Sequence, residues 1–594
     1  MAQKEIAWDL SEIFPSVTDP SIDVAIKNIT QMADSIVEKY QGKIKDLKPK
    51  DLLMFLQEYE KFLIESRSLG VFARLSFSAN MTLVETQSLN DKVNKWQALL
   101  GKKLAFLNLE IGDLVYKNPN FITNPVLSNY KHYLEKLQRI VPHQLTEIEE
   151  QLIIEKDQYG IQGWQQLQSK WLNTRIFDVE VEGEKKALSY GEANSLLPHP
   201  DRETRKSANK AIYSLLGNDG EIFSSALRNI CNDWINTSTR RKYESEMHAS
   251  LIANDTEQEI IDSLMKTIDD YSSVYRRYLN LKAKILDLPK LSNYDIDAPL
   301  PDAPDINYDW EKAKKTTIDA YKAFDEDYAF AIKDMFAKNH VDASTRYGKR
   351  NGAFCSSWFK GKTAYMLQSF NNSLDGVYTL AHEMGHATHD YYFSEEQTIL
   401  NGTMPMVVAE TASIFGELLV TDMLMKNAGS DKEKMAIIMQ VLDGAGMAAF
   451  QVTARAWFEQ DLYDAIKRGE FLDYKTICKY WTKNRDRIYQ DAIEWMEEMD
   501  AEWTMKQHYF MPNFRFYNYP YVYGQLFVYA LYQKYQEEGK SFVPKFKKVL
   551  AAGSSISPSE IGSILGLDVK DPDFWKLGIK RYEYFVEELE KLVK

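Results

Sequence analysis

The amino-acid sequence predicts a mainly α-helical protein with only small β-sheets, and three observations predict this class. Apolar residues recur at three- and four-residue spacing along most of the 594 residues, whereas segments rich in strand formers are short and few. Hydrophobic residues make up 44% of the chain, which is ample for a large core. No linker rich in Gly, Ser or Pro, no low-complexity segment and no convincing repeat divides the chain sharply.

The predicted elements follow in chain order. Residues 51–63 carry apolar positions at helical spacing and predict a helix. Residues 177–186, Phe-Asp-Val-Glu-Val-Glu-Gly-Glu-Lys-Lys, predict two short strands joined by a turn. A division of the chain is tolerated just after this excursion, near Pro-His-Pro-Asp at 198–201. Close to the C-terminus, residues 542–550 predict a helix that the Ala-Gly pair at 552–553 closes.

A hairpin is predicted in the middle of the chain. Residues 362–371, Lys-Thr-Ala-Tyr-Met-Leu-Gln-Ser-Phe-Asn, are rich in strand formers. The preceding segment 352–358, Gly-Ala-Phe-Cys-Ser-Ser-Trp, is expected to pair with them through a turn at 360–362. A short sheet with a free edge can bind an extended peptide through main-chain hydrogen bonds, largely independently of sequence. A small hairpin with a purely structural role is the alternative.

The stretch His-Glu-Met-Gly-His at 382–386 is the most informative pattern in the chain. It lies in a predicted helix that begins at the cap residue Ser373 and continues with apolar residues at helical spacing. His382 and His386 lie about 40° apart on one helical face, so both imidazoles can bind one metal ion. Glu383 stands beside the first imidazole, where its carboxylate can reach a water on that ion. Two ordinary core histidines are the alternative.

A third ligand is predicted on the next helix. Residues 406–425 are almost all apolar, and Lys-Asn-Ala-Gly at 426–429 closes them. Glu410 and Glu417 interrupt this helix within about 20° of the same face. Without a partner, an ionised carboxylate there would cost on the order of several kcal/mol. Zinc is the expected partner of Glu410. The expected partner of Glu417 is the ring N–H of a histidine that binds the zinc. A buried Arg or Lys is the alternative partner for either acid.

Two patterns carry a resemblance to a known family. They are H-E-x-G-H-x-x-H at 382–389 and A-E-x-x-S-x-x-x-E at 409–417. Together they resemble the thimet-oligopeptidase-like zinc metallopeptidases, and most closely the oligoendopeptidase F branch. Weaker landmarks of the same resemblance are spread over nearly the whole chain, as Trp-Asp-Leu at 8–10, the segment 349–360 and Phe-Tyr-Asn-Tyr-Pro-Tyr at 516–521.

The resemblance implies an architecture and a cofactor. It implies two helical lobes that enclose a deep substrate channel, with the small β-sheet beside the zinc site. It also implies an N-terminal helical region of oligoendopeptidase F type over residues 1–198 and a zinc metallopeptidase catalytic region over 199–594. One Zn²⁺ per chain would be held by His382, His386 and Glu410. The implied substrates are short unstructured peptides of varied sequence.

The resemblance also implies donors for the transition state. In relatives, a His and one or two Tyr from the C-terminal region hydrogen-bond the substrate and the developing oxyanion. By position these are His508, Tyr517 and Tyr521. A second alignment would use Tyr519 and Tyr523 instead. Aromatic residues in such a segment also commonly line a core or a groove, and His508 has the alternative of a satisfied core histidine.

His389 and Asp390 follow closely after the predicted ligands. A fourth protein ligand would close the metal to water, so His389 is not assigned as a ligand and is expected to support the site or the fold. Asp390 could orient a ligating histidine or face solvent, and it receives no role.

The composition restricts the partners and the compartment. The chain has 86 acidic and 72 basic residues, and its net charge of −14 argues against nucleic acid or an anionic membrane as partner. The first ten residues lack the apolar core of a signal peptide, and no run of 18 uncharged apolar residues predicts a membrane span. Cys231, Cys355 and Cys478 are isolated, as expected in a reducing cytoplasm. The sequence gives no indication of the oligomeric state.

These observations predict a cytoplasmic zinc oligoendopeptidase that hydrolyses internal bonds of short peptides through a zinc-activated water, with Glu383 as general base. A peptide-binding or chaperone-like protein with a structural zinc is one alternative, but such a site has no use for a base beside an open coordination position. A carboxypeptidase of related helical fold is the other. It would need a cationic anchor for the terminal carboxylate of its substrate, for which Arg515 is the candidate.

Overall fold

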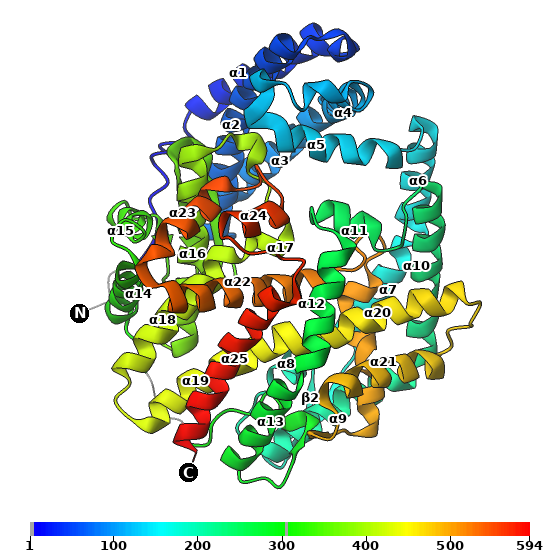
Figure 1. Ribbon diagram of the computed structural model, residues 1–594, viewed down its shortest axis with the longest axis vertical. Helices are drawn as coiled ribbons and strands as arrows, with labels where there is room; N and C mark the ends of the chain where they lie inside the picture. The colour runs from blue at the N-terminus through cyan, green and yellow to red at the C-terminus, as the bar shows by residue number, and fades with distance from the viewer. Residues whose placement is uncertain (1–4, 303–306, 594) are drawn as a thin grey trace. The chain divides into compact units, whose positions relative to one another are not determined.

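The computed structural model describes residues 5–302 and 307–593 and consists mainly of α-helices (Figure 1). The expected mainly helical class with small sheets is confirmed. The chain forms two compact units, each assembled from three separate stretches of sequence. The first unit comprises the described residues of 1–141, 306–427 and 534–568, and the second those of 142–305, 428–533 and 569–594.

The first unit contains a group of N-terminal helices and the elements around the predicted metal site. The N-terminal helices are α1 (Ser21–Tyr40), α2 (Pro49–Ala79), α3 (Val84–Lys103), α4 (Phe106–Lys117) and α5 (Lys131–Ile140). The other elements are α14 (Trp310–Phe324), α15 (Phe330–Ala337), β4 (Val341–Asp342), β5 (Phe354–Trp358), β6 (Thr363–Leu367), α16 (Leu374–Glu396), α17 (Met406–Ala409), α18 (Thr411–Asn427), α23 (Val543–Ala552) and α24 (Pro558–Ile564). The predicted helix over 51–63 lies inside α2, and the one over 542–550 is α23.

The second unit is also helical, and α22 (Tyr519–Glu538) begins in it and ends in the first. Its helices are α6 (Glu147–Tyr159), α7 (Gln162–Thr174), α8 (Tyr190–Ser195), α9 (Arg202–Asn218), α10 (Gly220–Arg240), α11 (His248–Ala253), α12 (Gln258–Tyr271), α13 (Ser273–Ile285), α19 (Asp431–Gly446), α20 (Val452–Lys467), α21 (Tyr474–Tyr489) and α25 (Pro572–Leu592). Its strands are β1 (Phe177–Val181), β2 (Glu184–Leu188), β3 (Leu291–Ser292) and β7 (Ile493–Glu494).

Both predicted hairpins are confirmed. β1 and β2 pair antiparallel through a turn at Glu182 and Gly183, whose φ angles of 52° and 85° are typical of a tight turn. β5 and β6 also pair antiparallel, with Ser356 opposite Tyr365. β4 adds to the other side of β6 in parallel, so the sheet order is β4-β6-β5 and β5 lies at its edge.

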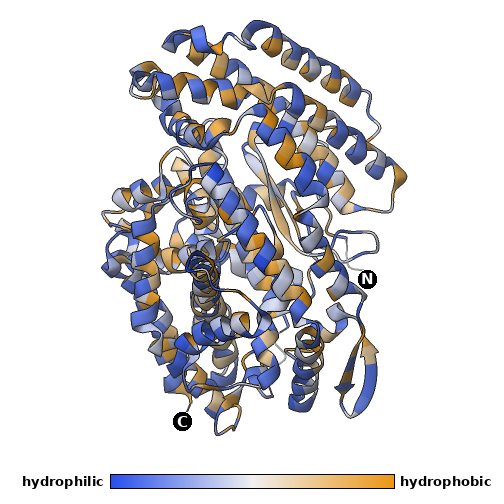
Figure 2. Cartoon of the chain, turned by 90° about the vertical axis from the view of Figure 1, so that its right-hand side faces the viewer, coloured by the Kyte–Doolittle hydropathy of each residue, from blue (hydrophilic) through white to orange (hydrophobic). Residues whose placement is uncertain are grey.

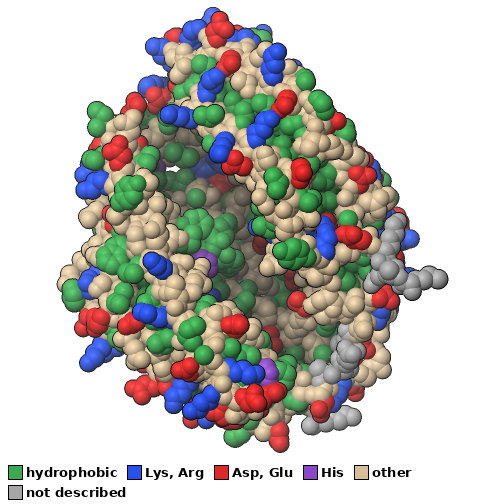
Figure 3. Space-filling model, turned by 180° about the vertical axis from the view of Figure 1, so that it is seen from behind, with side chains coloured by type: hydrophobic (Ala, Val, Ile, Leu, Met, Phe, Trp, Pro, Cys, Tyr) green, Lys and Arg blue, Asp and Glu red, His purple; other side chains and the backbone are tan. Residues whose placement is uncertain are grey.

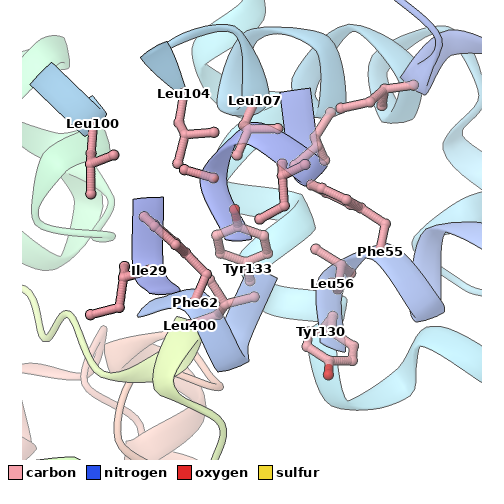
Figure 4. Close-up of a cluster of buried hydrophobic side chains, with 14 of the residues drawn as sticks. Ile29, Phe55, Leu56, Phe62, Leu100, Leu104, Leu107, Tyr130, Tyr133 and Leu400 are labelled. Atoms are coloured by element: carbon pink, nitrogen blue, oxygen red, sulfur yellow. The ribbon is translucent and has the colours of Figure 1, made fainter. Parts of the chain in front are cut away.

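The N-terminal helices of the first unit share one hydrophobic core. In this core, side chains from three helices point toward one another (Figure 4): Phe55 and Leu56 of α2, Leu107 of α4 and Tyr133 of α5. Leu400, about 270 residues further along the chain than this group, packs into the same cluster. The segment between α16 and α17 is thereby attached to the N-terminal helices.

Hydrophobic and hydrophilic residues occupy opposite sides of many helices (Figure 2). In the second unit, α19, a π-helical turn and α20 form one run, Asp431–Lys467, that is long and apolar enough by composition to cross a membrane. The run includes the charged residue Asp443, so it does not contradict the expectation, which concerned 18 uncharged apolar residues in a row. Half of the most apolar window of this run is buried in the protein, and α19 packs against α25. The core of the second unit thus accounts for much of its apolarity.

The two compact units do not follow the sequence division expected near Pro198, because each unit contains residues from before and after it. A family segment is a continuous stretch of sequence, whereas a compact unit is defined by contacts in space. The division into 1–198 and 199–594 therefore stays a prediction about the sequence.

Candidate metal centre

The predicted metal-binding helix is α16. The hydroxyl of Ser373 accepts a hydrogen bond from the Gly376 N–H, as expected of an N-cap. α16 packs against α14, α18, α23, β5 and β6, so most of its faces are buried (Figure 1). His382 and His386 share one face of the helix, with their ring centroids 4.9 Å apart.

The segment that carries the two acids is not one helix. α17 ends before Glu410, which has φ −91° and ψ 11°, and α18 begins at Thr411. The Thr411 hydroxyl donates to the Val408 carbonyl, and the Ser413 hydroxyl donates to the Glu410 carbonyl. Such side-chain bonds compete with helical pairing. The expectation of a single helix over 406–425 is therefore wrong at Glu410, and the Thr and Ser that follow it are the sequence signal for the break.

Three side chains converge on one point. Oε2 of Glu410 lies 3.3 Å from Nε2 of His382 and 3.4 Å from Nε2 of His386. The three potential ligand atoms lie within 4.8 Å of one another. Adjacent ligands of a tetrahedral metal with bonds of about 2.0–2.2 Å are separated by about 3.3–3.6 Å. The spacing and the donor types, two imidazoles and one carboxylate, therefore fit a metal ion.

The other acid of α18 contacts the outer nitrogen of the first imidazole. Oε1 of Glu417 lies 2.6 Å from Nδ1 of His382, so this ring donates its Nδ1–H and directs Nε2 toward Glu410. Burial would lower the pKa of His382, but the hydrogen bonds that its ring donates to both carboxylates outweigh this effect and raise that pKa to about 10. In Glu410, burial raises the pKa, and the bonds to the two imidazoles lower it well below its usual range. The cluster thus favours a bound cation.

A glycine allows the two helices to approach closely enough for these contacts. A Cβ atom at Gly385 would collide with the carbonyl of Ala412 and the backbone of Ser413. On the other helix, a Cβ at Gly416 would collide with the Tyr321 hydroxyl, which donates to the Ala381 carbonyl of α16. The backbone of α18 therefore lies directly against α16 on the face that carries the histidines.

Glu383 occupies the position expected of a general base. Its side chain is buried, and its carboxylate accepts a hydrogen bond from the Cys355 N–H of the edge strand β5. Burial raises the pKa of Glu383, although the neighbouring histidines oppose this. A pocket of about 460 Å³ is lined by Glu383 and His386 together with residues of β5 and of the segment before Glu410. A small substrate group can therefore reach both residues.

His389 and Asp390 lie in the same pocket but outside the group of three ligand atoms. Burial and the neighbouring His386 lower the pKa of His389 to about 3, so its ring is neutral. Burial raises the pKa of Asp390 to about 7, in spite of a hydrogen bond from the Ser357 hydroxyl. Among the described residues, the candidate ligand group consists of His382, His386 and Glu410, and neither His389 nor Asp390 belongs to it.

Cys355 gives no sign of a catalytic thiol. Burial raises the pKa of its thiol well above the usual range, and the carboxylates of Asp390 and Glu383 raise it further. A thiolate nucleophile requires the opposite surroundings. What Cys355 contributes to the site is its main-chain N–H.

His508, Tyr517 and Tyr521 form a cluster of their own in the second unit. The ring of His508 lies 4.6 Å from that of Tyr517, and the rings of Tyr517 and Tyr521 lie 5.1 Å apart. Burial lowers the pKa of His508, and the positive charges of Arg455 and Lys506 lower it further, so its ring is neutral at pH 7.

The second alignment of the tyrosines uses buried residues. Tyr519 and Tyr523 are 1% and 0% exposed, whereas Tyr521 is 39% exposed. The Tyr519 hydroxyl bonds with Ser250 and Asn254. Between the two pairs, the one with residues open to solvent is therefore Tyr517 and Tyr521.

Arg515 is not available as an anchor for a substrate carboxylate. Its guanidinium is buried, lies 3.0 Å from the Glu459 carboxylate and donates to the Tyr463 hydroxyl and the Tyr509 carbonyl. The residue that a carboxypeptidase interpretation would use is thus occupied within the protein.

Acidic and basic side chains are interspersed over the face of the molecule drawn in Figure 3.

Two family models match the sequence. The model described as Peptidase family M3 matches residues 195–580, which is more than half of the chain. The model described as Oligopeptidase F matches residues 119–172.

Relatives cover nearly the whole chain. The sequence is 27% identical over 595 residues to Oligopeptidase PepF of Bacillus subtilis, which covers 99% of this chain and 87% of that protein. It is 26% identical over 603 residues to an Oligoendopeptidase F homolog of Lactococcus lactis, covering 100% of this chain and 98% of that protein.

Solved structures share the fold. A crystal structure from Chlamydophila abortus matches with a TM-score of 0.88 at 22% identity, covering 99% of this chain and 98% of that one. The crystal structure of oligoendopeptidase-F from Enterococcus faecium matches with a TM-score of 0.69 at 21% identity, covering 96% and 99% of the two chains.

Proposed function

This chain belongs to peptidase family M3, and from that premise we propose that it is a zinc-dependent oligoendopeptidase. In this proposal it hydrolyses internal bonds of short unstructured peptides in the cytoplasm. The observation that carries the proposal is the convergence of His382, His386 and Glu410 on one point, beside the buried carboxylate of Glu383. The names of the Bacillus and Lactococcus relatives support peptides as the substrate class.

One Zn²⁺ per chain would be held by Nε2 of His382, Nε2 of His386 and a carboxylate oxygen of Glu410. When bound there, zinc supplies a Lewis acid that polarises a carbonyl and lowers the pKa of water toward about 7. Glu417 holds the His382 ring by its Nδ1–H, and Ser413 donates to the Glu410 carboxylate at 2.6 Å. These two contacts orient the ligands before any ion binds.

Glu383 acts as the general base and then as the general acid. Its carboxylate accepts a proton from the water that attacks the peptide carbonyl carbon, and it then donates that proton to the leaving amine nitrogen. The raised pKa of the buried carboxyl suits both transfers. The hydrogen bond from the Cys355 N–H keeps the carboxylate on the side of β5.

The edge strand β5 is the proposed platform for the substrate. Within the described residues it pairs only with β6, and its main chain contacts Glu383. An extended peptide added to this edge would be bound through its backbone, which accounts for substrates of varied sequence. A segment within a folded protein would first have to be released from its fold before it could bind in this way.

His508, Tyr517 and Tyr521 are the proposed donors to the developing oxyanion. The support for this pair of tyrosines is their accessibility, since the alternative pair is buried.

Two helical lobes that enclose a deep channel, with family regions at 1–198 and 199–594, belong to the same proposal and rest on the family resemblance. The cytoplasm is proposed because all three cysteines are free thiols, and peptides rather than nucleic acid or membrane because of the net charge of −14.

The test is cleavage of a peptide that is acetylated at its N-terminus and amidated at its C-terminus. A chelator should abolish cleavage, and one equivalent of zinc should restore it. Cleavage of an internal bond separates an endopeptidase from an exopeptidase, because both ends are blocked. The double variant His382→Ala/His386→Ala should lose both metal and activity, whereas His199→Ala in the second unit should keep both. Metal content near one per chain in the double variant would show that the ligands are other residues.

A further inference from the structure

A groove of about 710 Å³ lies within the first unit, between α2, α3 and the edge strand β5. The groove and the smaller pocket that contains Glu383 are adjacent, because both are lined by Cys355, Ser357 and Asp390. A strand advances about 3.3 Å per residue. An extended peptide paired with β5 beside Glu383 therefore enters this groove within a few residues of the scissile bond.

Three arginines line the groove. Arg67 and Arg74 lie seven residues apart on α2, which places them on the same face of that helix. Arg350 comes from the loop before β5. All three side chains are exposed to solvent, so the groove presents guanidinium groups from two separate parts of the chain.

None of these arginines has a carboxylate within ion-pair distance among residues 5–302 and 307–593. Other arginines of the protein do pair with carboxylates, as Arg346 does with Asp342 and Arg515 with Glu459. Three guanidinium groups without a salt bridge around one groove are unexpected in a chain with a net charge of −14, where acidic partners are abundant. The groove therefore holds three guanidinium groups without a salt bridge, and Asp390 is the acidic residue among its lining residues.

The arginines are held beside β5 by neutral groups. Nη2 of Arg74 donates to the Ser356 hydroxyl at 2.7 Å, and the guanidinium of Arg350 stacks on the Phe354 ring at 5.3 Å from its centroid. The main-chain N–H of Arg350 donates to the Ser78 carbonyl of α2. Partial burial lowers the pKa of Arg74, and the charge of Arg350 lowers it further, although both guanidiniums remain protonated. An anion between them would remove this repulsion.

We propose that Arg67, Arg74 and Arg350 form a subsite for a carboxylate of the substrate, placed along β5 a few residues from the scissile bond. A guanidinium binds a carboxylate through two parallel N–H···O bonds, and such charge-assisted bonds are the strong ones. The carboxylate is either the free C-terminus of a short peptide or an acidic side chain within it. The subsite would add a preference for anionic peptides to the sequence-independent pairing with β5. This inference rests on the proposed peptidase function.

Three peptides with one cleavable core test the subsite on the zinc-loaded, full-length protein. The first has neutral flanks and an amidated C-terminus, the second has the same flanks with a free C-terminal carboxylate, and the third is amidated with one Glu in its flank. The free carboxylate or the Glu should raise kcat/KM about tenfold or more over the neutral peptide. The peptide whose kcat/KM rises shows whether the subsite binds the C-terminal carboxylate or the Glu side chain.

The variant that should remove the preference is Arg74→Gln/Arg350→Gln. In this variant the ratio of kcat/KM between anionic and neutral peptides should fall to about one, whatever its activity on the neutral peptide. Arg228→Gln is the matched control, because Arg228 lies in the second unit and, within the part of the chain that the structure describes, contacts the Leu472 carbonyl, the Ser225 hydroxyl and the Phe471 ring. It should leave the ratio unchanged. Arg74→Lys/Arg350→Lys should recover part of the preference, since charge is kept without the planar fork.

A ratio near one in the wild-type protein, or the same ratio in the Gln variant, would overturn the subsite. The Gln double variant could lose activity on the neutral peptide as well. In that case the kcat/KM ratio between anionic and neutral peptides is measured in the single variant Arg67→Gln, because the Arg67 side chain makes no hydrogen bond to β5. A lower ratio than in the wild type supports the subsite, and an unchanged ratio overturns it. Fluorescence anisotropy of the same labelled peptides reports binding even when no bond is cleaved. If the neutral peptide is not cleaved after zinc loading, the result counts against the proposed function. If it is cleaved but anionic peptides are not preferred, the result counts only against the subsite.

Discussion

Glu383 and Glu410 are both partly or fully buried carboxylates, yet their surroundings shift their proton affinities in opposite directions. Burial dominates in Glu383 and raises its pKa. In Glu410 the hydrogen bonds from His382 and His386 outweigh burial and lower its pKa. A carboxylate that stays ionised suits a metal ligand, and one that takes up a proton readily suits a base. The difference supports the separate roles proposed for them.

Glu383→Gln should retain bound metal and peptide but reduce kcat by about 10² or more, because general base catalysis typically contributes about 10²–10⁴. Single-turnover kinetics and metal analysis on the same preparation are the measurements. Glu396→Gln is the control, since Glu396 is an exposed acid at the end of the same helix. A kcat near that of wild type in Glu383→Gln would mean that another group accepts the proton.

Tyr517→Phe or Tyr521→Phe should reduce kcat by roughly 10²–10³ if its hydroxyl stabilises the oxyanion, with a smaller effect on KM. Tyr519→Phe is the control. Its buried hydroxyl bonds with Ser250 and Asn254, so its loss should reduce stability by about 0.5–1.5 kcal/mol and leave kcat unchanged. Steady-state kinetics and thermal unfolding of the three variants separate these effects. Loss of turnover in Tyr519→Phe alone would assign the role to the buried pair.

At the scale of elements, the site depends on how closely α16 and α18 pack. His382 and His386 come from α16, whereas Glu410 precedes α18 and Glu417 lies within it. The hydrogen bond from His382 to Glu417 and the contacts of both histidines with Glu410 require the two backbones to lie side by side. A glycine at position 385 is what makes this distance possible.

Gly385→Ala should therefore destabilise the protein by roughly 1–3 kcal/mol or more, because the added methyl group would overlap the backbone of α18. It should also weaken metal binding by separating the ligands. Gly444→Ala is the matched control: Gly444 lies in α19 with open space around its Cβ position, and Ala there should stabilise by about 0.5–1 kcal/mol. Thermal unfolding and zinc titration measure both effects. Equal melting temperatures for the two variants would contradict the packing argument.

At the scale of the whole molecule, most of the chain lies outside the residues that hold the metal. Each compact unit is built from three stretches of sequence. The proposed metal ligands belong to the first unit and the proposed oxyanion donors to the second. By family resemblance, the surrounding helices are expected to enclose the site in a channel. A folded substrate would have to unfold, at a cost of about 5–15 kcal/mol, before its backbone could reach such a site.

We therefore predict cleavage of short unstructured peptides and none of folded proteins. A series with one fixed cleavable sequence and flanks lengthened on both sides should show rates that fall with length, because threading both ends becomes entropically harder. Peptides extended on one side only are the control, since they separate threading from total length. Rates that stay constant up to a denatured full-length protein would mean an open cleft, and the size limit would be abandoned.

The sequence by itself determined the fold class, the two hairpins and the donor types of the candidate metal site. These features depend on patterns within a few residues, such as the i, i+4 histidines of α16 and its cap at Ser373, which local geometry translates directly into structure. Which side chains become buried could not be predicted in this way, because burial depends on contacts with segments that are distant in sequence. Nothing local distinguishes Tyr517 from Tyr519, and only packing leaves the former accessible.

The tertiary structure alone decided what depends on residues far apart in sequence. It broke the expected helix at Glu410, next to the hydrogen bond from the Thr411 hydroxyl to the Val408 carbonyl. It buried Arg515 against Glu459, and it brought Arg74 of α2 beside Ser356 of β5. Local propensity states which conformations each segment favours, but the contacts between segments are decided by the packing of the whole chain, and the free energy that selects among them is shared by many residues at once.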